Sequence, residues 1–295
     1  MKFSLWPNAS RPATDIVAAA RAADDAGWFG VWIADHYMPN TGDTSFAPGD
    51  THEAWGLLPA IAVTTRRVRI GTLVSPTSIH HPAVLANRAA TIDHLSGGRM
   101  VLGLGAGWQV NEHAAYGIEL EPPGPRVTRF SEAIRIVRSL LTEDATTFAG
   151  DVYTITDAPC DPKPIQERLP ILVGTSSPRM LRITARHADE WNTWGTPQSA
   201  AGARARLVEA CERVGRDPAT VRCSVNAMVD LDGETPAPGR PHVAGSAEQL
   251  VEAMAAYAEA GFDEFNLPDA NLGDTFAERS DRIARFKAEV ADRLG

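Results

Sequence analysis

The sequence predicts an α/β fold of the (β/α)8 TIM-barrel class, in a single domain spanning residues 1–295. Three observations lead to this prediction. Short β-rich runs alternate with helical runs along nearly the whole chain, which is the pattern of a parallel sheet covered by helices. The alternation provides eight strands and eight helices, the number that this barrel requires. A length of 295 residues also fits one such barrel without a second domain.

The strands are predicted from short apolar, β-branched or aromatic runs that are bounded by glycine, proline or polar residues. Each run is followed, after a connection, by a segment of helical character. In chain order the predicted strands are Phe3–Trp6, Phe29–Ala34, Val68–Leu73, Met100–Leu104, Ile171–Val173, Glu190–Thr193, Val221–Val229 and Phe262–Leu267.

The helices are predicted from apolar residues that recur every three to four positions, most clearly between Val127 and Leu141. The first helix is expected to end before Gly27, because glycine suits a left-handed C-cap. In chain order the predicted helices are Ala13–Ala26, Glu53–Thr65, Val84–Leu95, Val127–Leu141, Met180–His187, Ala200–Val214, Ala247–Ala260 and Phe276–Leu294.

One segment departs from the alternation, between the fourth helix and the fifth strand. Two short β-rich runs, Thr146–Phe148 and Val152–Ile155, flank the turn residues Ala149–Asp151 and predict a small hairpin. The proline-containing stretch Pro159–Pro170 is expected to be irregular. This hairpin and irregular stretch are therefore the only insertion expected in the barrel.

Composition and charge exclude several classes of protein. With 44% apolar and 22% charged residues, the chain is typical of a globular protein rather than of a disordered or fibrous one. The net charge is −9 and no basic block exceeds the pair Arg66-Arg67, so nucleic acid is not expected as a partner. No apolar run approaches the roughly 20 residues of a spanning helix. A signal peptide is also not recognisable, so we expect a cytoplasmic protein without membrane contact.

The cysteine and histidine patterns predict no metal site. Cys160, Cys211 and Cys223 cannot all pair and lack the spacing of metal ligands. Cys211 shares an apolar helical stripe and Cys223 alternates with apolar strand residues, so both are expected to be packing residues. The eight histidines include no His-Glu-x-x-His pattern. The sequence also contains no nucleophile elbow and no P-loop.

Residues that directly follow the strands are expected to form the active site, as in other barrels of this class. Asp35 and His36 follow the second strand, and His36 is the one imidazole among the strand ends. Consecutive strand residues face opposite sides, so both side chains cannot point inward if the strand stays regular there. A purely structural role at the strand end is the alternative for His36.

Two glycine-containing segments also lie at strand ends. The run Gly103-Leu-Gly105-Ala-Gly107 has the wrong spacing for a dinucleotide fingerprint and predicts a tight strand exit where a ligand can approach the backbone. Gly174-Thr175-Ser176 precedes a helix, whose first N–H groups and the nearby hydroxyls can hold a phosphate. The alternative there is a helix cap, with Ser177 at the N-cap and Pro178 at N1, and the two roles are compatible.

These residues are part of a longer set of motifs. Through them the chain resembles the bacterial luciferase-like flavin monooxygenase superfamily, most closely its branch that depends on coenzyme F420, a deazaflavin. The resemblance spans nearly the whole chain. Its motifs are Ala26-Gly27-x-x-Gly30-Val31-Trp32-x-x-Asp35-His36, Arg69-Ile70-Gly71-Thr72-Leu73-Val74-Ser75-Pro76, His81-Pro82-Ala83, Asp93-His94-x-Ser96-Gly97-Gly98-Arg99, Gly103-x-Gly105-Ala106-Gly107-Trp108 with Asn111-Glu112, Pro170-Ile171-Leu172-Val173-Gly174 and Ala185-x-His187-Ala188-Asp189-x-Trp191-Asn192.

The resemblance implies roles for individual residues. Asp35 and His36 match the pair beside the deazaflavin ring, where the histidine transfers a proton or hydrogen-bonds to the ring. Thr72-Leu73 matches a non-proline cis peptide that forms a bulge behind the ring. The other matched cofactor positions are Ser75, Gly107 and Asn111, together with the phosphate-binding turn Gly174, Thr175 and Ser176.

At two positions the chain departs from the family pattern, and each departure changes what we expect of phosphate or substrate binding. Thr175 replaces a second glycine that relatives often have, so more hydroxyl and less backbone contact to the phosphate is expected. Trp108 stands where the sugar-phosphate dehydrogenases of the family have an acidic residue, which implies a more apolar substrate pocket. Trp194 is a second candidate for lining the substrate, its alternative being an aromatic that caps the core. The segments Tyr37–Asp50 and Asp230–Pro241 are expected to contribute to substrate recognition.

The expected function is that of an oxidoreductase that transfers a hydride between coenzyme F420 and a small organic substrate. The alternative is an FMN-dependent monooxygenase that obtains reduced flavin from a separate reductase, and a third hypothesis is a cofactor-binding barrel without catalysis. The anionic tail of F420 would need cations, for which Arg126, Lys163 and Arg179 are candidates. Because relatives are commonly dimers, a homodimer is also a possible assembly of this chain.

Overall fold

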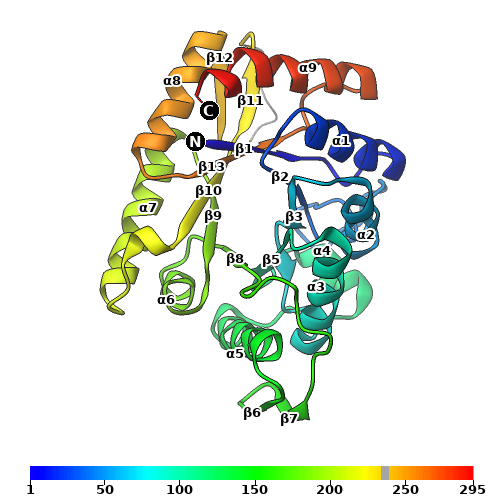
Figure 1. The fold of residues 1–295 in the computed structure, drawn as a ribbon, viewed down its shortest axis with the longest axis vertical. Helices are drawn as coiled ribbons and strands as arrows, with labels where there is room; N and C mark the ends of the chain where they lie inside the picture. The colour runs from blue at the N-terminus through cyan, green and yellow to red at the C-terminus, as the bar shows by residue number, and fades with distance from the viewer. Residues whose placement is uncertain (234–238, 295) are drawn as a thin grey trace. The chain divides into compact units, whose positions relative to one another are not determined.

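The computed structural model describes residues 1–233 and 239–294, and the chain divides into two compact units. The first unit comprises Met1–Asn8, Thr14–Trp32 and Thr175–Gly295, and the second comprises Ala9–Ala13 and Ile33–Gly174. Strands alternate with helices along the described chain in the predicted order, as the labels of Figure 1 show. The expectation of a single domain stays a prediction.

In the first unit, five parallel strands of the main sheet lie in the order β2-β1-β13-β10-β9. These strands are β1 (Lys2–Trp6), β2 (Gly30–Ile33), β9 (Glu190–Trp194), β10 (Arg222–Asn226) and β13 (Glu264–Pro268). The helices are α1 (Ala13–Asp25), α6 (Pro178–His187), α7 (Pro197–Glu212), α8 (Ala247–Glu259) and α9 (Phe276–Glu289), with 3₁₀ turns at Pro218–Thr220 and Ala291–Arg293. A separate parallel pair, β11 (Met228–Leu231) and β12 (His242–Gly245), completes the described elements of this unit.

An aromatic cluster forms much of the core of the first unit. Phe3 of β1 contacts Phe265 of β13 and Phe286 of α9, with ring centroids 6.4 Å and 6.0 Å apart. Trp28 also stacks on Phe286, with ring centroids 6.5 Å apart. Burial of each such side chain stabilises a fold by roughly 1.5–3 kcal/mol. The cluster therefore fastens α9 to the two neighbouring strands.

The second unit is built around β5 (Met100–Gly105), which pairs in parallel with three other strands. Those strands are β3 (Arg69–Thr72), β4 (Ser75–Pro76) and β8 (Ile171–Gly174). The helices are α2 (Ala54–Thr64), α3 (Pro82–Ser96), α4 (Val110–Tyr116) and α5 (Pro123–Thr142). The predicted apolar positions of α5, from Val127 to Leu141, are all buried.

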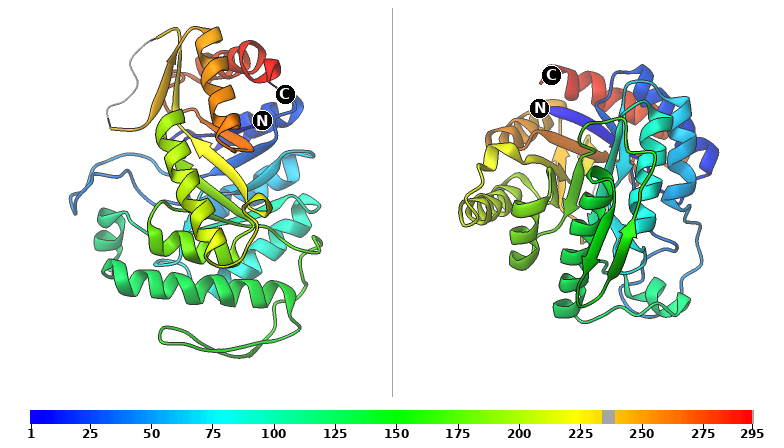
Figure 2. Two further views of the ribbon diagram at one scale, coloured as in Figure 1. Left: turned by 90° about the vertical axis from the view of Figure 1, so that its left-hand side faces the viewer. Right: turned by 60° about the horizontal axis from the view of Figure 1, so that its bottom comes forward.

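The predicted hairpin is confirmed and consists of β6 (Thr146–Ala149) and β7 (Thr154–Ala158). It runs beside α5, as Figure 2 shows. The buried Glu132 carboxylate of α5 accepts hydrogen bonds from the backbone N–H groups of Asp151, Val152 and Tyr153, at 2.8, 3.1 and 3.0 Å. One side chain thereby satisfies three donors of the hairpin turn.

Several features of the described chain differ from the sequence expectations, and the strands β4 and β12 were not predicted. The predicted strand Val221–Val229 is interrupted at Ala227, because β10 pairs with the main sheet while β11 pairs with β12. The short helix α4 was not expected, since its buried residues Asn111, Glu112 and His113 are polar and give no apolar stripe. Within the predicted recognition segment Asp230–Pro241, positions 234–238 lie outside the described residues.

In the part of the chain that the structure describes, no helix has the length and apolar character needed to cross a membrane.

Candidate functional site

Asp35 follows the end of β2 and is the centre of a buried polar cluster in the second unit. Its Oδ2 accepts hydrogen bonds from His80 Nε2 at 2.9 Å, Ser75 Oγ at 2.5 Å and Trp55 Nε1 at 3.0 Å. Its Oδ1 has no hydrogen-bond partner among the described residues. Asp35 itself is fully buried, so its carboxylate contacts these three side chains rather than solvent.

The cluster favours the ionised form of Asp35. Burial opposes ionisation of the carboxyl group, but the hydrogen bond and charge of His80, together with the Ser75 hydrogen bond, more than offset it. The pKa of Asp35 is consequently lowered from its ordinary value. Asp35 therefore resembles a fixed negative charge rather than a group that exchanges protons.

His36 has a different environment from its neighbour. Its side chain is 24% exposed, and its Nδ1 lies 3.0 Å from Oε1 of Glu112, which is 1% exposed. The imidazole also meets the Trp108 ring edge-on, with centroids 5.4 Å apart. Both Asp35 and His36 lie past the end of β2, and only His36 remains accessible. Of the predicted pair, His36 is therefore the one that remains accessible to solvent.

The glycine run of β5 packs against the segment between β3 and α3. A Cβ atom on Gly103 would lie 1.9 Å from the Thr72 carbonyl oxygen, and one on Gly105 would lie 2.7 Å from Val74 Cγ2. A Cβ atom on Gly107, whose φ is +91°, would lie 1.9 Å from Ser78 Oγ. The close approach that these glycines permit is thus to the chain's own backbone and side chains, and the approach of a ligand to them stays a prediction.

The non-proline cis peptide occurs at Leu73-Val74, one bond later than the predicted Thr72-Leu73. Thr72 is still the last residue of β3, and its hydroxyl donates to the Gly103 carbonyl oxygen at 2.8 Å. Val74, just after the cis bond, faces Gly174 at the end of β8, where an added Cβ atom would lie 3.1 Å from Val74 Cγ1. The predicted residues Thr72, Leu73, Ser75 and Gly174 are therefore neighbours in the second unit.

Helix α4 anchors the start of the predicted recognition segment Tyr37–Asp50. Asn111 Nδ2 donates to the Pro39 carbonyl oxygen at 2.8 Å, and Gln109 Nε2 donates to that of Met38 at 2.9 Å. Asn111 is buried, and its Oδ1 has no hydrogen-bond partner in the described chain. Farther along the segment, Phe46 is exposed. The base of this segment is thus fixed while its tip faces solvent.

The predicted phosphate turn precedes α6 in the first unit. The Thr175 N–H donates to the Asn192 carbonyl oxygen at 3.2 Å, and its hydroxyl accepts from the Ser177 N–H at 3.3 Å. Ser177 occupies the N-cap position without a side-chain capping bond, and Ser176 is exposed. Pro178 stands at N1, as predicted. The backbone N–H of Thr175 is committed to the sheet, so an anion there would meet hydroxyl groups.

Trp194 ends β9 in the first unit and is half-buried between two neighbours. Its ring lies 5.4 Å from the Trp6 ring, and the Arg240 guanidinium stands 4.8 Å above it. Arg240 belongs to the predicted recognition segment Asp230–Pro241, so that segment does contact a predicted substrate-lining residue. Trp191, by contrast, is fully buried and donates to the Thr175 carbonyl oxygen at 2.8 Å.

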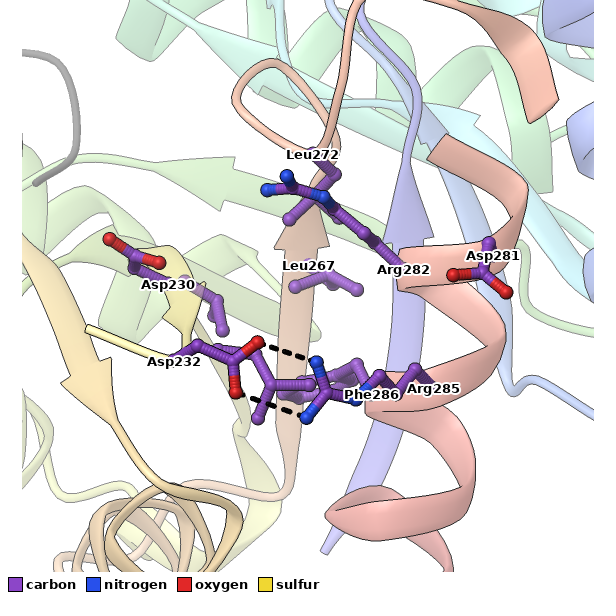
Figure 3. Close-up of a pocket in the computed structure, with 10 residues that line it drawn as sticks. Asp230, Asp232, Leu267, Leu272, Asp281, Arg282, Arg285 and Phe286 are labelled. Atoms are coloured by element: carbon purple, nitrogen blue, oxygen red, sulfur yellow. Dashed lines mark hydrogen bonds and ion pairs between the residues drawn. The ribbon is translucent and has the colours of Figure 1, made fainter. Parts of the chain in front are cut away.

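A separate pocket of about 170 Å³ lies in the first unit between β11, the end of β13 and α9 (Figure 3). Asp232 and Arg285 face each other there in a two-point ion pair, with distances of 2.6 and 3.0 Å. The hydrogen bond from Arg285 lowers the pKa of the Asp232 carboxyl group. Apart from Asp230–Asp232, none of the predicted site residues lines this pocket, which we treat as distinct from the candidate site.

Three residues of the site were not assigned a role from the sequence. Glu112 holds His36, while His80 and Trp55 bind Asp35. Glu112 was part of a matched motif, and its place one residue after Asn111 in that motif was the available signal. His80 and Trp55 are distant from Asp35 in sequence and lie in no motif with it, so only the fold brings them together. Among the described residues, no group of three or more histidine, cysteine or carboxylate side chains could hold a metal ion.

Comparisons with known proteins connect this site to a family. The chain is 36% identical over 178 residues to an F420-dependent glucose-6-phosphate dehydrogenase of Amycolatopsis mediterranei. That match spans 59% of this chain but only 51% of the dehydrogenase, so the chain spans about half the length of this relative. An uncharacterised protein of Mycobacterium tuberculosis is 31% identical over 291 residues, covering 93% of both chains.

The fold is shared along the whole chain with solved structures. A coenzyme F420-dependent tetrahydromethanopterin reductase from Methanopyrus kandleri superimposes with a TM-score of 0.85 at 17% identity, covering 100% of this chain and 99% of the reductase. This likeness confirms the predicted (β/α)8 TIM-barrel class. A model of the luciferase-like monooxygenase family matches residues 1–237, and the chain therefore belongs to that family.

Proposed function

We propose that this protein is a coenzyme F420-dependent oxidoreductase that transfers a hydride between the deazaflavin and a carbon atom of a small organic substrate. The observation that carries the proposal is the accessible His36 imidazole, which is held by the buried Glu112 carboxylate directly after β2. The F420-dependent enzymes among its relatives and structural neighbours support this choice of cofactor.

One buried acceptor of the second unit would suit a ring with hydrogen-bond donors at its edge. The buried Asn111 side chain is fixed by its amide nitrogen, while its Oδ1 lacks a partner among the described residues. A ring N–H group would satisfy that oxygen, since a buried acceptor without a partner is costly. In the first unit, the hydroxyls of Thr175 and Ser176 before α6 would hold a phosphate, with Gly174 leading into the turn.

Each part of the site has a role in such a reaction. When bound, the deazaflavin supplies or accepts two electrons as a hydride. His36 would take the hydroxyl proton of an alcohol substrate during oxidation, or return a proton to the carbonyl oxygen during reduction. Trp108, which is 53% exposed beside His36, would cover the apolar part of the substrate and reduce access of water. The substrate-lining roles of Trp108 and Trp194 remain proposals.

The test is turnover with a deuterated substrate. A panel of secondary alcohols and of their ketones is incubated with oxidised or reduced F420, and the cofactor absorbance is followed. The proposal expects turnover of at least one pair, with deuterium from the alcohol carbon found in the reduced cofactor. Oxygen-dependent turnover with reduced FMN and none with F420 would instead identify the FMN-dependent monooxygenase, the alternative within the same family. Binding without any turnover would identify a non-catalytic barrel.

A further inference from the structure

Glu112 joins the catalytic histidine to the backbone of the same loop. Its Oε1 lies 3.0 Å from His36 Nδ1, and its Oε2 accepts the backbone N–H of Tyr37 at 3.1 Å. The side chain comes from α4 and is 1% exposed. Each carboxylate oxygen thus bonds to one of two consecutive residues, His36 and Tyr37. This double attachment fixes where the imidazole ring lies relative to Glu112.

We infer that Glu112 is the positioning residue that sets the tautomer of His36. An ionised carboxylate can only accept hydrogen bonds, so the Nδ1 atom that faces it must carry a proton. The neutral imidazole then presents an unprotonated Nε2, which is the atom that can take a proton from a substrate hydroxyl. This inference rests on the proposed function, and it names the atom of His36 that performs the proton transfer.

Neighbouring titratable groups do not compete for this role. The Asp35 carboxylate precedes His36 in sequence, but its Oδ2 is engaged by His80, Ser75 and Trp55. His80 is 7% exposed and pairs with Asp35. The Tyr37 hydroxyl lies 3.4 Å from His80 Nε2, and burial together with the Asp35 charge raises the pKa of Tyr37 above its ordinary value. That phenol therefore stays protonated and cannot serve as the base.

The two carboxylate–histidine pairs of the second unit thus differ in accessibility. Asp35–His80 is closed to solvent, whereas Glu112–His36 exposes the outer part of one imidazole beside Trp108. A carboxylate that orients a histidine through one nitrogen while the other nitrogen exchanges a proton is an arrangement that enzymes use for acyl transfer. Here the same physical principle would serve the oxidation of an alcohol.

The substitution Glu112→Gln gives a specific test because it keeps the size and shape of the side chain while it removes the charge and replaces one acceptor by a donor. The amide oxygen can continue to accept the Tyr37 N–H, and the amide nitrogen then faces His36 Nδ1 as a donor. His36 Nδ1 must in that case become an acceptor, so the proton moves to Nε2. The variant is expected to keep the imidazole in place but to present the wrong atom to the substrate.

The tautomer is measured by nitrogen NMR on cofactor-free protein labelled with ¹⁵N-histidine, at alkaline pH where imidazoles are neutral. The His36 signals are assigned by their loss in His36→Asn. We expect the proton on Nδ1 in the wild type and on Nε2 in Glu112→Gln. In the turnover assay, kcat of Glu112→Gln should fall by about tenfold or more, with KM for the cofactor nearly unchanged.

Glu132→Gln is the matched control. Glu132 is also a buried carboxylate of the second unit that accepts backbone N–H groups, but it contacts the hairpin and not His36. It should lower the melting temperature without changing the His36 signals or kcat. If Glu112 had only a structural role, the two variants would behave alike.

The possible results separate this inference from the proposed function. A wild-type proton on Nε2 would overturn the inference, whether or not the protein uses F420, and this result does not depend on how any variant folds. A proton that moves in Glu112→Gln without loss of kcat would also overturn it. If the wild type fails to turn over F420, the proposed function fails, while the NMR result still decides whether Glu112 sets the tautomer.

Discussion

At the scale of single residues, two adjacent side chains, Asp35 and His36, have different environments. Asp35 is a buried carboxylate whose charge is stabilised by three donors, whereas His36 is accessible and has one ring nitrogen engaged. The family resemblance implies a place beside the cofactor for both, but the sequence could not predict how their environments differ. The difference depends on His80 and Glu112, which only the folded chain brings to Asp35 and His36.

Replacement of His36 should affect turnover more than binding. In His36→Asn the side chain keeps its polarity but loses the imidazole that would exchange a proton with the substrate, so kcat should fall about a hundredfold or more. The affinity for F420, measured by fluorescence quenching, should change little. Wild-type turnover in this variant would remove His36 from the mechanism.

The stability that Asp35 contributes should depend on pH. Its pKa in the folded chain is lowered below the value of 3.8 that an unperturbed carboxyl has. A group of this kind stabilises the fold above its unfolded pKa, and the contribution is lost as the pH falls through the folded pKa. The difference in free energy of unfolding between wild type and Asp35→Asn should therefore shrink from about pH 7 to about pH 3.

Urea unfolding at a series of pH values measures this difference directly. A difference that stays constant or grows towards acid would show that Asp35 is not the fixed charge described above.

At the scale of elements, most strands and helices were predictable because their signals are local. The periodic apolar positions of α5 and the turn residues of the hairpin suffice to specify those elements. Helix α4 was missed because its buried face is polar: Asn111, Glu112 and His113 form hydrogen bonds with other segments instead of packing in an apolar core. The β10–β11 boundary was missed because it depends on which strand each half pairs with.

Two glycines that flank α4 provide a matched test of the packing between β5 and the segment before α3. Gly107→Ala combines a left-handed backbone with a Cβ atom 1.9 Å from Ser78 Oγ, which also bonds to His113 Nε2 at 2.8 Å. Gly117→Ala has a left-handed backbone too, but nothing lies within 4 Å of its Cβ position. We expect losses in free energy of unfolding of about 2–4 kcal/mol for the first and about 1 kcal/mol for the second.

Chemical denaturation of the two variants gives both values. Equal losses would mean that backbone conformation alone requires glycine at position 107, and that Ser78 is free to move.

At the scale of the whole molecule, the sequence was sufficient for the family and the fold class, because motifs along nearly the whole chain specify them. The ligands were less predictable. The chain carries a net charge of −9, so an anionic cofactor must be held by a few local donors against an unfavourable overall field. We propose the hydroxyls of Thr175 and Ser176 before α6 as such donors.

The identity of the cofactor is the claim on which the rest depends, and a comparative titration tests it most directly. The intrinsic tryptophan fluorescence of the wild-type protein is followed during addition of oxidised F420 and, separately, of FMN. We expect saturable quenching by F420 with an affinity at least about tenfold higher than for FMN, a difference of about 1.4 kcal/mol. Equal or tighter binding of FMN, or no saturable quenching by F420, would contradict the proposal.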